Sequence, residues 1–177
     1  MTIETKYSKA YNDAVSQLEK ACHDKGILAS TLDQDNYKKV WSRDAIIAGI
    51  AGLLINNERI TQSFKQALLL LAKHQLIKGT IPSNVMEDGN NTTTVSHGSL
   101  AGRVDATSWF IIGACLYIKK TNDDAFKHQL LPHIEKGLHI LDCWEYNNKH
   151  LTYTPLSGNW PCFSAIFTPP TAACPGA

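Results

Sequence analysis

The chain has 177 residues, of which 44% are hydrophobic and 19% are charged, and its formal net charge is +1. This balance is typical of one globular domain with a hydrophobic core. The scattered lysines and arginines argue against a nucleic-acid or anionic-membrane partner. The first residues lack the apolar core of a secretory signal, and the longest apolar runs are too short to cross a bilayer. We therefore expect a cytoplasmic protein, with its oligomeric state left open.

Five cysteines are present, at positions 22, 115, 143, 162 and 174. Their number is odd, and neither a CxxC pair nor a Cys/His spacing typical of a metal site occurs. Cys115 lies inside an apolar run, where a free thiol acts as a small hydrophobic group. We expect free thiols, no metal and no organic cofactor.

Helical periodicity dominates the first part of the chain. Apolar residues from Tyr7 to Ala21 recur at three- and four-residue steps, which predicts an amphipathic helix ending near Gly26. Residues 44–56 (DAIIAGIAGLLIN) are apolar almost all round, which predicts a helix buried on most faces. Within it, Gly49 and Gly52 would permit close helix packing.

Three further segments follow. Thr61 is the expected cap of a third helix with a more polar face. Residues 79–103, rich in Gly, Asn, Thr and Ser, predict a long loop, which in a compact domain is usually functional or disordered. Residues 106–118 predict another buried helix, although their β-branched and aromatic side chains leave a strand open. Residues 123–141 predict an amphipathic helix that Pro132 kinks or breaks.

The expected helices alternate between polar and apolar surfaces. Such an alternation predicts an all-α fold in which inner and outer helices form two layers of a toroid, and it would also suit a stack of helical hairpins. After Trp160 the chain reads PCFSAIFTPPTAACPGA, with four prolines, no charge and no periodicity. We therefore divide the chain into a helical part, 1–160, and an irregular tail, 161–177, that a frameshift or truncation would explain.

Three residues at the start of the buried helix at residues 44–56 are candidate binding residues. Trp41 offers an apolar face for a sugar ring, and Arg43 and Asp44 offer charged hydrogen bonds to hydroxyl groups. A bland interpretation is that Asp44 caps the helix beside a surface arginine, and composition alone favours it.

The start of the helix at residues 106–118 repeats this arrangement. Asp105 is preceded by Arg103 and followed by Trp109. A purely structural interpretation is again that Asp105 caps the helix. However, two such starts on alternate helices would bring both acids to one end of an inner ring, and capping needs neither the arginine nor the tryptophan.

Polar groups elsewhere are weaker candidates. Asn84 ends the loop motif GTIPSN, and His97 follows in SHG; loops often carry binding groups, yet His97 suits an ordinary surface histidine equally well. Glu145 follows Trp144 in an aromatic and polar stretch that would suit a carbohydrate cleft or a packed aromatic corner.

The motifs VWSRDA, GTIPSN, RVDATSWFI and TPLSGNW, in this order from about Asn36 to Trp160, resemble (α/α)6 glycosidases. This group includes the glucosidase domain of glycogen-debranching enzymes, glucoamylases and alkaline/neutral invertases. The resemblance implies that Asp105 is the general acid, and that Trp41, Arg43 and Asp44 line the pocket for the non-reducing sugar. It also implies an oligo- or polysaccharide substrate, with a glucosyl unit released from an α-glucan by inversion.

The chain departs from this family in its length. Inversion needs two carboxyl groups about 6.5–9.5 Å apart, and in these families the base is a Glu from the second half of the barrel. About five helices are expected here, whereas the full toroid has twelve, so we expect the base to be missing and the chain to be a fragment. Glu145 is the fallback acid, because glucoamylases place their acid in a Trp-Glu pair.

The acid role of Asp105 also requires that its carboxyl group hold a proton. A helix N-terminus and a neighbouring arginine both favour a carboxylate, whereas a general acid must carry a proton. We therefore expect Arg103 to point away from Asp105 or to contact substrate. Sucrose hydrolysis of the neutral-invertase kind and a non-catalytic module that binds carbohydrate or a partner remain the alternatives.

Overall fold

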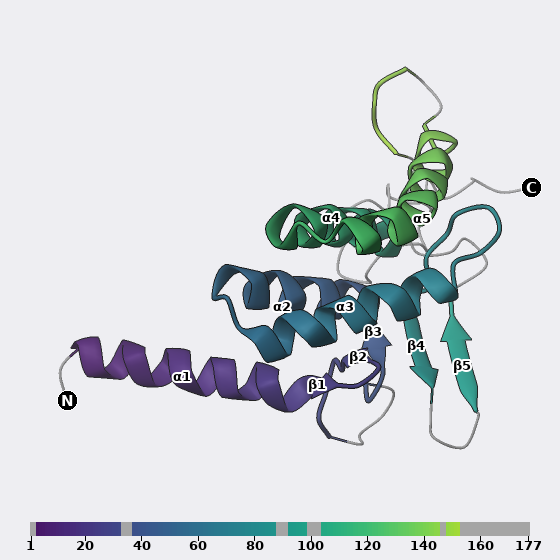
Figure 1. Cartoon of the computed structure of the whole chain (residues 1–177). Coiled ribbons are helices and arrows are strands. Elements are labelled where there is room, and N and C mark those ends of the chain that lie inside the picture. The colour runs from purple at the N-terminus through teal and green to yellow at the C-terminus, as the bar shows by residue number, and fades with distance from the viewer. Residues whose placement is uncertain (1–2, 33–36, 88–91, 99–103, 146–147, 153–177) are drawn as a thin grey trace, which may run out of the picture.

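The structure of the chain is a computed structural model that describes residues 3–32, 37–87, 92–98, 104–145 and 148–152. The predictions for Arg103 and for the tail at 161–177 therefore lie outside the described residues. Five helices occupy most of the described chain, which confirms the all-α prediction (Figure 1). They are α1 (Ile3–Ala21), α2 (Ser42–Leu54), α3 (Glu58–Lys73), α4 (Val104–Thr121) and α5 (Asp124–Asp142).

The helices pack in chain order. α2 lies against both α3 and α4, and α4 lies against α5, whereas α1 contacts α3 over a small area (Figure 1). The apolar helices α2 and α4 are thus neighbours, each followed by an amphipathic helix that packs against it. This is the expected alternation, and closure of such helices into a toroid remains a prediction.

Short strands join the helices, which the sequence did not indicate. β1 (Cys22–His23) and β2 (Gly26–Ile27) form a hairpin, so the first helix ends at Ala21 and not near Gly26. β3 (Val40–Trp41), β4 (Asn84–Glu87) and β5 (Thr93–Ser96) form an antiparallel sheet in that order. The prediction of a structureless loop at 79–103 was therefore wrong. Its strands are held by backbone pairing with each other and with β3, which side-chain periodicity does not reveal.

The two glycines of α2 do allow close packing, as predicted. A Cβ at Gly49 would lie 2.1 Å from the buried ring of Phe64, and a Cβ at Gly52 would lie 2.4 Å from Ile60. The predicted cap at Thr61 was wrong, because α3 begins at Glu58 and the Asn57 side chain accepts the Ile60 N–H at 3.0 Å. The helix-capping position therefore lies four residues earlier than the apolar pattern suggested.

The structures of α4 and α5 decide whether residues 106–118 form a helix or a strand and whether Pro132 breaks its helix. Residues 106–118 lie within α4, which excludes the strand. α5 runs from Asp124 to Asp142 with Pro132 inside it, so the proline does not break the helix. Pro132 is exposed, so its ring meets solvent and not the core.

The faces of α2 and α4 that no other described element covers are apolar. Ile47, Leu54, Ile112 and Leu116 are 40–76% exposed. Cys115 is exposed on the same helix as Ile112 and is not part of the core, contrary to our expectation. None of the helices in the described chain is long and apolar enough to cross a membrane.

Candidate active site

The first wall of the site is the junction between β3 and α2. Trp41 pairs with Asn84 of β4, and α2 begins at the next residue, Ser42. The Ser42 N–H donates to the Ser83 carbonyl at 2.9 Å, and its hydroxyl donates to the Pro82 carbonyl. These bonds connect the junction to the segment just before β4, and they orient the first turn of α2.

The second wall is the start of α4, which is anchored to the same segment. The Ile81 N–H donates to the hydroxyl of Thr107 at 3.0 Å, and both residues are buried. The GTIPSN motif thus forms a strap that holds the starts of α2 and α4 side by side. The sequence suggested this motif only as a weak binding loop, and nothing local in it indicates a bridging role.

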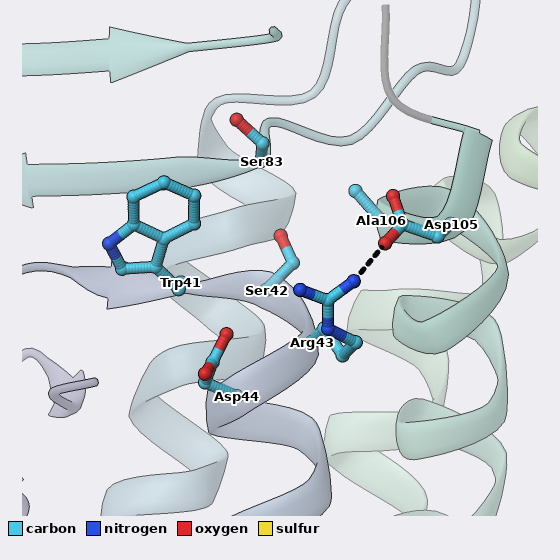
Figure 2. A pocket seen from close by; sticks show the side chains of 7 residues that line it. All are labelled: Trp41, Ser42, Arg43, Asp44, Ser83, Asp105 and Ala106. Atoms are coloured by element: carbon cyan, nitrogen blue, oxygen red, sulfur yellow. Dashed lines mark hydrogen bonds and ion pairs between the residues drawn. The ribbon is translucent and has the colours of Figure 1, made fainter. Parts of the chain in front are cut away.

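The two helix starts share one pocket (Figure 2). The residues that line it are Trp41, Ser42, Arg43, Asp44, Ser83, Asp105 and Ala106. Asp44 and Asp105 therefore open onto the same concave surface and not onto opposite faces. Ser42 and Ser83 also line it, although the sequence did not single them out. The volume inside is about 20 Å³, room for about one water molecule.

The capping interpretation does not describe Asp44. The N-cap residue of α2 is Trp41, no side chain makes the cap hydrogen bond, and Asp44 lies within the first turn. Asp105 likewise lies within the first turn of α4. At these positions the helix dipole favours a negative charge, but the side chains remain available to the pocket.

The central interaction of the pocket is an ion pair between the helices. Arg43 Nη1 lies 2.7 Å from Asp105 Oδ2, and the two side chains are 27% and 26% exposed (Figure 2). We expected Arg103 to point away from Asp105 or to contact substrate; in the described residues, the arginine that pairs with Asp105 is Arg43. A general acid must deliver a proton to the leaving group, so this direct contact with a guanidinium counts against the acid role of Asp105.

Trp41 also has an aromatic neighbour. Its ring stacks on that of Tyr37, with centroids 5.8 Å apart and planes inclined by 27°. The stacked pair fixes the plane of the indole, and Trp41 also lines the pocket. An oriented aromatic ring of this kind offers a flat apolar surface for a ligand.

Two other predicted binding residues, Asn84 and Trp109, are not part of the pocket lining. Asn84 is buried at the start of β4, and its amide lies 3.4 Å from the Ser83 hydroxyl. Trp109, one turn after Asp105, is half-buried and packs against the core. Arg103, the remaining candidate, is outside the described residues.

His97 lies just after β5. Its Nε2 is buried without a hydrogen-bond partner among the described residues. Burial lowers the pKa of His97, an effect that a hydrogen bond to the backbone of His74 partly opposes. A neutral, half-buried imidazole fits a packing role at the base of the sheet better than a ligand contact.

Glu145, the fallback acid, follows α5. Its carboxylate accepts the backbone N–H of Lys149 at 2.9 Å, and its backbone forms an isolated bridge with Thr152. It is not part of the pocket lining that holds Asp105. The structure thus keeps these two carboxyl groups in separate local environments.

Comparison with known proteins identifies the family. No curated protein matches the chain. The family model for amylo-alpha-1,6-glucosidase matches residues 13–147, a range that includes α2 to α5 and every residue that lines the pocket. Because this match covers more than half of the chain, the protein belongs to the amylo-alpha-1,6-glucosidase family.

Proposed function

We propose that the pocket at the starts of α2 and α4 binds the terminal glucosyl unit of an α-glucan, and that Asp105 is the acid of an inverting glycoside hydrolase. The observation that carries this proposal is the convergence of Arg43, Asp44 and Asp105 with Trp41 in one pocket. The family match supports the same class of enzyme.

Each residue has a role that follows from its chemistry. The stacked indole of Trp41 packs against the apolar face of the sugar ring. Arg43 and Asp44 form charge-assisted hydrogen bonds with sugar hydroxyls. Asp105 donates a proton to the glycosidic oxygen as the bond to the anomeric carbon breaks.

Inversion also needs a base on the opposite face of the sugar, about 6.5–9.5 Å from the acid. Asp44 is the second carboxylate of the described lining, and we assign it to sugar hydroxyls because it shares the first turn of α2 with Arg43. The base is therefore left to a residue outside this lining. Such a residue would also help to enclose the sugar, since the pocket itself is too small to do so.

The test is glucose release from isomaltose, an α-1,6-linked disaccharide, and from sucrose, measured on a protein that supplies the base as well as this pocket. Asp105→Asn should abolish turnover of isomaltose but retain turnover of α-glucosyl fluoride, whose leaving group needs no proton. Asp142→Asn, at an exposed position at the end of α5, is the matched control. Equal loss on both substrates would assign Asp105 to sugar binding and not to acid catalysis. A preference for sucrose would favour an invertase-like hydrolase.

A second candidate is a module that binds carbohydrate without hydrolysing it. The ion pair between Arg43 and Asp105 favours it, because the pair occupies the carboxyl group that hydrolysis would need as a proton donor. Under this alternative isomaltose binds, Trp41→Ala and Asp44→Asn weaken binding, and no glucose is released. Turnover that depends on Asp105 would exclude this alternative.

A further inference from the structure

We propose that His139 and Cys143, at the C-terminal end of α5, form a two-ligand site for a borderline-soft divalent cation such as Zn²⁺. Imidazole nitrogen and thiolate sulfur are ligands that zinc prefers in proteins. Neither residue lines the pocket at the starts of α2 and α4. The metal site is therefore independent of the proposed function, and each can fail without the other.

The spacing of the two residues places them on one face of the helix. α5 ends at Asp142 and Cys143 is its C-cap residue, so His139 lies four positions earlier, in the last turn. Side chains four positions apart on a helix are neighbours, and two histidines at this spacing bind one zinc ion in metalloproteases. Both side chains are exposed, so an ion can reach them without any opening of the core.

The distance between the two donor atoms suits a shared metal ion. His139 Nε2 lies 3.7 Å from Cys143 Sγ. In a tetrahedral zinc site, with Zn–N of about 2.0–2.1 Å and Zn–S of about 2.3 Å, two such donors are about 3.5 Å apart. Without metal the contact is a weak hydrogen bond between thiol and imidazole. When the metal binds, it replaces the thiol proton, which passes to solvent.

The surroundings of the pair also favour a cation. The C-terminal end of a helix carries the negative end of the helix dipole, and both ligands lie at that end of α5. Within one turn of the pair the helix carries the acidic residues Glu135 and Asp142 and the basic residue Lys136. Acidic groups thus outnumber basic ones along this part of α5.

The pair supplies only part of a coordination shell. In the described part of the chain, no group of three or more His, Cys, Asp or Glu residues is placed to hold a metal ion. We therefore assign the remaining positions to water, with one ion bound per chain. Such an ion joins the last turn of α5 to its C-cap residue.

Cobalt(II) is a suitable probe, because a cobalt–thiolate bond gives a charge-transfer absorption that cobalt bound to oxygen or nitrogen alone does not give. Titration of the reduced wild-type chain with Co²⁺ should produce this absorption, with saturation at one ion per chain. Addition of Zn²⁺ should then remove it, because zinc competes for the same ligands and has no such band.

Three variants assign the ligands. Cys143→Ser should lose the absorption, and His139→Ala should weaken cobalt binding at least about tenfold, since a single ligand lacks the advantage of chelation. Cys115→Ser is the matched control. Cys115 is also an exposed free thiol on a helix, but Ile111 and Lys119 stand four positions before and after it, so its loss should leave the absorption unchanged. Circular dichroism checks that each variant keeps its helices.

The other cysteines remain in every variant, so the comparison isolates Cys143. Absence of the absorption in the wild-type chain, or its survival in Cys143→Ser, overturns the site. Unchanged affinity in His139→Ala overturns the pair and leaves the thiol as a ligand without the histidine. Saturation at one ion per two chains overturns the role of water and assigns the remaining ligands to a second copy of the chain.

Discussion

Replacement of Glu87 by Gln should destabilise the chain, because this carboxylate joins three separate segments. Glu87 of β4 contacts Lys73 at 2.5 Å and His74 at 3.0 Å, both at the end of α3, and Lys25 of the first hairpin turn at 3.7 Å. These partners lower the pKa of Glu87 from 4.5 to about 2, with the hydrogen bond from Lys73 as the largest cause.

The magnitude follows from that shift. At 1.36 kcal/mol per pKa unit, a fall from 4.5 to about 2 corresponds to roughly 3 kcal/mol of stabilisation. The Glu87 side chain is 13% exposed, but that of Lys73 is 63% exposed, so solvent and salt screen part of the interaction. We therefore expect Glu87→Gln to lower the free energy of unfolding by about 1–2 kcal/mol near neutral pH.

The pH dependence gives a sharper test than the size of the effect. Because the pKa is lower in the folded state, the stabilisation is present above about pH 4.5 and is lost as the pH falls towards 2. The difference between the wild type and Glu87→Gln should therefore shrink over this range. In Glu87→Gln itself this contribution to the acid sensitivity is absent.

Urea denaturation followed by circular dichroism measures both quantities. With a slope of about 2 kcal/mol per molar urea, the midpoint should fall by roughly 0.5–1 M at neutral pH. Glu135→Gln, at an exposed site on α5 with no ion pair in the described part of the chain, should leave it unchanged. An unchanged midpoint in Glu87→Gln, or a difference that persists at the lowest pH, would refute the reasoning.

Three further changes should have measurable effects. Gly49→Ala should lower stability by about 1–3 kcal/mol, because the new Cβ would lie 2.1 Å from the ring of Phe64; a urea midpoint equal to that of the wild type would contradict this. Asn57→Ala should cost about 1 kcal/mol through loss of the cap on the Ile60 N–H, and Asn57→Ser should recover most of it. For His97, whose pKa is lowered by burial, wild-type stability should fall as the pH drops below 6.5, because the unfolded state takes up the proton first. His97→Phe should lose this part of the profile, and parallel profiles would show that the histidine contributes nothing.

Much of the fold was predictable because it depends on short-range patterns. The apolar spacing within residues 44–56 and 106–118 indicated α2 and α4, and the glycines at 49 and 52 indicated a close helix contact. The strands β4 and β5 were not predictable: β4 pairs with β3, more than 40 residues earlier, and β5 pairs with β4. A sequence rich in Thr, Ser and Asn has no apolar alternation to mark them.

The candidate site likewise combines local features, which the sequence shows, with long-range contacts, which it does not show. The sequence by itself determined that Trp41, Arg43, Asp44 and Asp105 stand at the starts of two apolar helices, because each motif is local. Only the tertiary structure decided that these starts share one pocket, that residues 81–83 hold them together, and that Arg43 pairs with Asp105. An ion pair between side chains 62 positions apart depends on how two helices pack, and no periodicity within either helix specifies that arrangement.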